Sequence, residues 1–190
     1  MLSSSCWPSR RWLEKARAAA LCLALAVAGA ALPGAAHANW RDELPQARAV
    51  GGGELRWFGL RIYHATLWSE KQPFDPAARF ALQLRYHRSI SRERLVQTSM
   101  DEIRRLGIAP RDAATAQRWE AQLRTAFVDV AEGDQLVGLH LPGQGMRLYD
   151  RDKLLAEIPD PQLAQAFFGI WLHESSRDQN LRRQLLGGQP

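Results

Sequence analysis

The sequence predicts an α+β fold, in which an antiparallel β-sheet is covered on one side by a layer of helices and is preceded by a cleaved signal peptide. Segments with the strand period of two lie before and after a central block with helical periodicity. A hydrophobic fraction of 46% and a charged fraction of 24% over 190 residues are typical of a folded protein. No repeat and no Pro/Ser/Gly linker divides the chain after its N-terminal segment, so we expect one domain there.

The N-terminal segment has the three parts of a secretory signal. Basic residues between Arg10 and Arg17 precede an apolar run over residues 18–32, and Ala36-His37-Ala38 supplies a small-x-small cleavage site. We therefore expect residues 1–38 to be a signal peptide cut after Ala38, and residues 39–190 to form a periplasmic or otherwise secreted domain. The rival interpretation, an uncleaved anchor, needs about 20 apolar residues, more than this run provides. We expect no stable membrane anchor after cleavage.

This cleavage limits the chemistry of the mature chain. Cys6 and Cys22, the two cysteines, both fall in the signal peptide, so neither a disulfide nor a thiolate metal site is expected after it. Of the net charge of +5, the segment before Asn39 carries +3. The remaining excess is too small for a nucleic-acid partner to be expected.

The first elements after the signal peptide are predicted strands. Residues 55–58 and 60–68 are rich in aromatic and branched side chains and meet at Gly59, which indicates two strands or one bent strand. They follow a run of three glycines, Gly51 to Gly53. Residues 80–86 alternate between apolar and polar side chains, as in a strand with one solvated face.

Two helices are predicted next. Val96, Met100 and Ile103 form one apolar stripe on a helix that begins near Ser91 as N-cap and ends at Gly107. A second helix is expected between Asp112 and Val130, with Trp119 on its apolar face.

Strands and helices alternate in the last third of the chain. Residues 136–141 and 146–150 flank Pro142-Gly143-Gln144-Gly145, which predicts a hairpin, and residues 154–158 are a further candidate strand. Asp160 before Pro161 predicts the start of a buried helix. A final helix is expected over residues 178–186.

The usual catalytic and metal-binding motifs are missing from the sequence. The histidines after the signal peptide lie on separate elements without ligand spacing, so no metal and no cofactor are expected. Asp101 and Glu102 are adjacent on a predicted helix, which turns them about 100° apart, so we expect solvated surface and not an acid/base pair. The tryptophans are expected in the core.

One strand has two mixed faces. Leu60, Ile62, Thr66 and Trp68 point one way, and Arg61, Tyr63, Ala65 and Leu67 point the other. Either an amphipathic ligand covers the second face, or this is an ordinary sheet face whose Tyr and Arg tips reach solvent.

The order and spacing of several segments resemble the bacterial exported branch of the chalcone isomerase-like family. The segments are Leu55 to Trp68, Phe80 to Tyr86, Ser91 to Leu106, Leu139 to Gly143, Ala166 to Leu172 and Leu181 to Leu186. The resemblance implies a large antiparallel sheet backed by helices, with a ligand cleft between them. In this family, plant chalcone isomerases close a flavanone ring without a cofactor, whereas relatives in plastids bind fatty acids.

The resemblance also suggests which residues form the site. The family's isomerases place a tyrosine and an asparagine on the helix that here carries Ser91, Arg92, Thr98 and Ser99, so efficient ring closure is not expected. Tyr63 falls where the fatty-acid-binding relatives hold a ligand carboxylate. Their arginine falls near residues 50–53, which makes Arg48 and Arg56 the nearest candidates.

Three functions stay open at this point. The first is non-catalytic binding of a fatty acid or similar amphipathic carboxylate by Arg48, Arg56, Tyr63 and Thr66. The second is a cofactor-free isomerase or lyase for a conjugated carbonyl compound, with Tyr63 and Thr66 as hydrogen-bond donors. The third is a structural or partner-binding protein of the cell envelope, in which the cleft is packed core.

Overall fold

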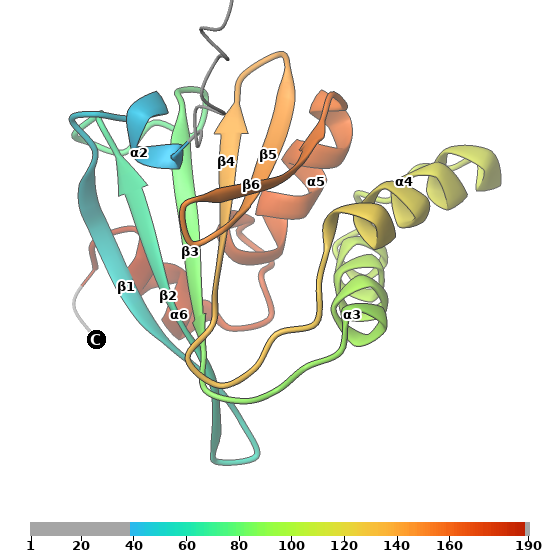
Figure 1. The fold of residues 1–190 in the computed structure, drawn as a ribbon, viewed down its shortest axis with the longest axis horizontal. Coiled ribbons are helices and arrows are strands. Elements are labelled where there is room, and N and C mark those ends of the chain that lie inside the picture. The colour runs from blue at the N-terminus through green and yellow to red at the C-terminus, as the bar shows by residue number, and fades with distance from the viewer. Residues whose placement is uncertain (1–38, 189–190) are drawn as a thin grey trace, which may run out of the picture. The chain divides into compact units, whose positions relative to one another are not determined.

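The fold is built on one six-stranded antiparallel sheet whose strands follow each other in sequence order (Figure 1). The computed structural model describes residues 39–188, so the predicted signal peptide lies outside the described residues. The strands are β1 (Arg48–Trp57), β2 (Leu60–Ser69), β3 (Phe80–Tyr86), β4 (Gln135–Leu141), β5 (Gly145–Asp150) and β6 (Lys153–Ile158). Two strands joined at Gly59, and the hairpin around Pro142–Gly145, are thereby confirmed.

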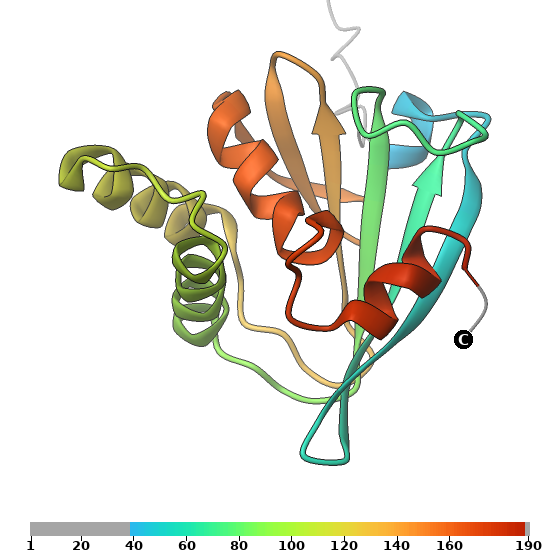
Figure 2. The same ribbon diagram turned by 180° about the vertical axis from the view of Figure 1, so that it is seen from behind.

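Four helices form a layer on one face of this sheet (Figure 2). They are α3 (Arg92–Arg105), α4 (Ala113–Ala126), α5 (Pro161–Leu172) and α6 (Gln179–Leu185). Each begins after a polar N-cap, Ser91, Asp112, Asp160 or Asp178, whose side-chain oxygen accepts a hydrogen bond from the backbone N–H three residues on. The predicted α+β class and the helix positions are confirmed.

The opposite face of the sheet has a smaller cover that the sequence did not predict. A short helix, α2 (Trp40–Glu43), brings Trp40 and Leu44 onto β3, β4 and β5, where they pack against Val137, Leu139 and Tyr149. Trp40, Trp119 and Trp171 are buried, as expected. Trp57 is not, because 51% of its surface is exposed.

The glycine run lies within β1 and explains how α6 reaches the sheet. A Cβ atom on Gly51 would overlap the backbone carbonyl oxygen of Gln184, and one on Gly53 would overlap the Gln184 side chain. Glycine ordinarily weakens a strand, but it also permits the close approach of another backbone. The helix α6 therefore packs directly on the backbone of β1, which fixes one wall of the space between sheet and helices.

Among the helices within residues 39–188, none has the length and apolar character needed to cross a bilayer.

Gly51→Ala tests this packing. The added methyl group has no room beside the α6 backbone, so we expect the free energy of unfolding to fall by about 3 kcal/mol, as for overpacked cores. Urea denaturation followed by circular dichroism measures the change. Gly169→Ala in α5 is the matched control, because its new Cβ would meet the flexible end of Ile108 at 3.1 Å and the Cβ of His173 at 4.0 Å, and no backbone atom outside its own helix. Equal stability of Gly51→Ala and the original chain would contradict the account.

Candidate functional site

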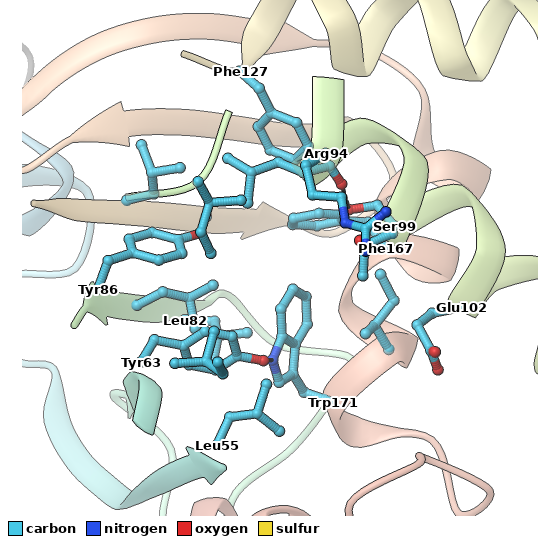
Figure 3. Close-up of a pocket in the computed structure, with 18 of the residues that line it drawn as sticks. Leu55, Tyr63, Leu82, Tyr86, Arg94, Ser99, Glu102, Phe127, Phe167 and Trp171 are labelled. Carbon is cyan, nitrogen blue, oxygen red and sulfur yellow. Dashed lines mark hydrogen bonds between the residues drawn. The ribbon is translucent and has the colours of Figure 1, made fainter. Parts of the chain in front are cut away.

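A cavity of about 730 Å³ lies between the sheet and helices α3, α5 and α6 (Figure 3). Its walls come from β1 to β5 on one side and from the three helices on the other. The lining is largely apolar and includes Leu82, Leu84, Phe127, Leu136, Leu148 and Phe167. The volume falls within the range of about 300–1,000 Å³ that is typical of small-molecule sites. The cleft that the family resemblance implies is thus present.

Tyr63 faces this cavity from β2. Its side chain is partly buried, and its hydroxyl oxygen accepts a hydrogen bond of 2.9 Å from Nε1 of Trp171 in α5. Its ring meets Tyr86 of β3 edge to face, with 5.9 Å between ring centroids. Burial raises the pKa of both phenols well above the ordinary value, so both hydroxyls keep their protons. Among residues 39–188, neither hydroxyl proton has a hydrogen-bond acceptor, and both remain available to a ligand.

The other residues singled out from the sequence do not join Tyr63. Thr66 pairs with Gln83 and lies on the opposite face of the sheet, because it is three positions from Tyr63 and side chains alternate between the two faces of a strand. Arg48 and Arg56 are exposed and lie outside the cavity lining. Tyr63 is therefore the one member of the predicted set that reaches the cavity.

A different arginine, Arg94 in the first turn of α3, lines the cavity. Figure 3 shows it on the helix side of the cavity, across from Tyr63 and Tyr86. Within the described part of the chain, no carboxylate lies within ion-pair distance of its guanidinium. One sequence signal points to it: Arg94, Thr98 and Asp101 lie beside the apolar stripe of α3 at helical spacing, and all three line the cavity.

Glu102 is not a solvated surface residue, and the sequence prediction for it was wrong. Its side chain is 12% exposed and accepts hydrogen bonds of 2.7 Å from Nε of Arg105 and of Arg177. Burial acts to raise the pKa of the Glu102 carboxyl, but the hydrogen bonds from Arg177 and Arg105 outweigh it and hold the pKa below its ordinary value. This cluster joins α3 to the segment before α6 at the cavity wall. Asp101 is exposed, as predicted.

Comparison with known proteins gives consistent matches. A family model described as chalcone isomerase-like matches residues 52–187. A protein of Haemophilus influenzae, described as uncharacterized, is 30% identical over 139 residues, which cover 73% of this chain and 67% of that protein. The crystal structure of a fatty-acid binding protein of Arabidopsis thaliana superposes with a TM-score of 0.55 at 12% identity, over 75% of this chain and 87% of its own. At that identity, the likeness concerns the fold alone.

The three tyrosines of the chain provide a direct test of burial at the site. Burial raises the pKa of Tyr63, of Tyr86 and of Tyr149, so each should ionise in the folded protein at a pH above about 10, the ordinary value. Absorbance at the phenolate band of the folded protein should therefore rise at a higher pH than that of the chain in urea.

The same shifts make stability depend on pH. Because the unfolded chain releases these protons first, the free energy of unfolding should fall as the pH rises above about 10. A phenolate signal at that pH from protein that is still folded would contradict the burial of these side chains.

Proposed function

Because the chain belongs to the chalcone isomerase-like family, we propose that it is a binding member of that family, which holds a fatty acid or a similar amphipathic carboxylate between sheet and helices. The proposal needs no cofactor and no reaction. The fatty-acid binding named for the Arabidopsis protein with the same fold supports it. We further propose that the chain acts in the periplasm or outside the cell, after cleavage at Ala38.

The observation that carries the proposal is Arg94 at the edge of an apolar cavity. A guanidinium without a carboxylate partner presents several N–H donors, and a ligand carboxylate is the acceptor that matches its geometry. Arg177 also lines the cavity, but its guanidinium already forms an ion pair with the Glu102 carboxylate. Arg94 therefore takes the role that the sequence analysis gave to Arg48 or Arg56.

The apolar lining accounts for the rest of the ligand. Each methylene group that moves from water into the cavity contributes about 0.8 kcal/mol. Lengthening the ligand from octanoic to dodecanoic acid should therefore increase affinity by about 3 kcal/mol, on the order of a hundredfold, as long as the cavity has room.

The two phenols narrow the ligand class further. Tyr63 and Tyr86 each offer a proton inside the cavity, away from Arg94. A saturated chain leaves both without an acceptor, which costs free energy in an apolar site. A chain with an oxygen atom along its length, such as a hydroxy or oxo fatty acid, satisfies at least one of them.

The alternatives receive less support from the geometry. The isomerase hypothesis assigns Tyr63 and Thr66 to one substrate, and these side chains lie on opposite faces of the sheet. On α3, the hydroxyl of Ser99 already donates its proton to the backbone oxygen of Leu95 at 2.8 Å, so it has none to offer a substrate. The hypothesis of a purely structural envelope protein requires packed side chains where the structure has an open cavity.

Arg94→Gln tests the carboxylate anchor. Loss of a charge-assisted hydrogen bond of about 1.5–3 kcal/mol should weaken binding of hexadecanoic acid by roughly 10- to 100-fold. Isothermal titration calorimetry of delipidated protein measures this affinity. Hexadecanol should bind both proteins equally, because it lacks the charge.

Arg183→Gln in α6 is the matched control, since Arg183 lies outside the cavity. Equal loss of acid and alcohol binding in Arg94→Gln would indicate damage to the cavity and not a lost anchor. Absence of binding across octanoic, dodecanoic and hexadecanoic acid would overturn the proposed function.

Tyr63→Phe tests the internal donor. Binding of a hexadecanoic acid with a mid-chain hydroxyl should weaken about fivefold, the value of one net hydrogen bond, whereas saturated hexadecanoic acid should bind at least as tightly as before, because it offers the Tyr63 proton no acceptor. Tyr149→Phe is the matched control, because Tyr149 packs on the other face of the sheet. Identical responses to the two ligands would remove Tyr63 from the site.

A further inference from the structure

The hairpin tip, residues 56–61 at the turn between β1 and β2, presents large apolar side chains to solvent. Trp57 is 51% exposed, Phe58 89% and Leu60 48%. The rings of Trp57 and Phe58 touch edge to face, with 5.2 Å between centroids. Figures 1 and 2 show this turn extending past the ends of the other strands, away from the packed helices. Adjacent exposed apolar side chains at a protruding tip are typical of an interaction site.

The backbone conformation at the hairpin tip is unfavourable for a bulky residue. Phe58 and Gly59 both have positive φ, 47° and 79°, as in a two-residue type I′ turn. Asparagine is preferred at the first of these positions, and a bulky residue there is strained. The chain thus places a large aromatic ring where both the backbone and the solvent disfavour it. A side chain that breaks local rules in this way indicates a role for the ring itself.

The hairpin tip also carries two arginines that repel each other. Arg56 and Arg61 face each other directly across the two strands, an arrangement that is destabilising for like charges. Both are exposed, and among residues 39–188 neither has a carboxylate within ion-pair distance. The nearest carboxylate along β1, Glu54, is bound by His64 and His87 at 3.2 Å each. Each strand therefore carries one arginine without a carboxylate partner among these residues, Arg56 directly before Trp57 and Arg61 directly after Leu60.

We propose that the hairpin tip docks on the surface of an anionic phospholipid bilayer. Trp57, Phe58 and Leu60 enter the boundary between headgroups and acyl chains, where aromatic side chains are favoured. Arg56 and Arg61 then lie at the level of the lipid phosphates, which neutralise their mutual repulsion. Docking on an anionic bilayer thereby removes the aromatic rings from water and also neutralises the repulsion between the two arginines.

This docking does not depend on the proposed fatty-acid binding, although it places the cavity close to the bilayer. Trp57 belongs to the tip and also lines the cavity, and the guanidinium of Arg177 lies over its ring at 5.9 Å. The docked tip therefore brings one wall of the cavity to the membrane surface.

The test uses vesicles of phosphatidylglycerol that carry bromine on their acyl chains and quench nearby tryptophan. The protein is purified in the form in which the producing cells release it, and every variant has the same N-terminus. Quenching that is present in the original chain and missing in Trp57→Phe isolates the contribution of Trp57. We expect this contribution with phosphatidylglycerol, and at least tenfold weaker binding to phosphatidylcholine, because each arginine near an anionic surface contributes roughly a fivefold gain in affinity.

Phe58→Asn is the decisive variant. It removes the ring and supplies the residue that the turn prefers, so its midpoint of thermal unfolding should equal or exceed that of the original chain. Its affinity for phosphatidylglycerol vesicles should fall about tenfold, as expected for an aromatic side chain lost from an apolar phase. Arg56→Gln with Arg61→Gln should reduce binding to a similar extent and remove the preference for anionic lipid.

Leu154→Thr is the matched control, because Leu154 is an exposed apolar residue of β6, outside the tip. It should leave vesicle binding unchanged. The proposal is overturned if Phe58→Asn binds vesicles as well as the original chain, or if Trp57 is not quenched. It is also overturned if analytical ultracentrifugation shows that the tip joins two copies of the chain while vesicles are left unbound. Fatty-acid titrations without vesicles report separately on the cavity.

Discussion

An open apolar volume between a sheet and its helices is the constraint on which the site depends. Protein interiors are normally close-packed, so a cavity of about 730 Å³ forgoes many favourable contacts between side chains. It persists because the helices are fixed at its edges. Helix α6 packs onto the β1 backbone at Gly51 and Gly53, and the Glu102 carboxylate joins α3 to the segment before α6. The walls are thereby tied together without filling the space.

The polar groups of the cavity have separate physical roles. Trp171 and Tyr63 bond to each other, which satisfies the indole N–H and fixes the phenol in one orientation. Burial keeps the phenols neutral, so they act as donors and not as charges. Arg94 is an arginine of the cavity lining that has no carboxylate partner among the described residues, and it lies at the rim, where its desolvation cost is small. A neutral interior with an unpaired guanidinium at its edge is matched to an amphipathic anion.

Much of the fold could be predicted from sequence because its signals are local. Ser91 and the stripe of Val96, Met100 and Ile103 define α3 within one segment, and the hairpin around Pro142 to Gly145 is equally self-contained. No local pattern explains the three glycines of β1. They are needed because α6, more than a hundred residues later in the chain, packs directly on the β1 backbone.

The site was only partly predictable, for a similar reason. Strand alternation places Tyr63 and Thr66 on opposite faces, so the sequence already contained the argument against using them together. The arginine was harder to find, because which flank of α3 faces the cavity depends on how the helix is rotated against the sheet. Trp57 illustrates the limit of composition-based expectation, since an aromatic side chain in a strand is usually buried.

Binding of a fatty acid in the cavity is tested most directly by a crystal structure of the protein with hexadecanoic acid that carries bromine on its terminal carbon. We expect an anomalous bromine peak between the sheet and helices α3, α5 and α6, with the carboxylate within hydrogen-bond distance of the Arg94 guanidinium. A bromine bound elsewhere on the molecule, with the cavity lined by Tyr63 and Trp171 unchanged, would contradict it.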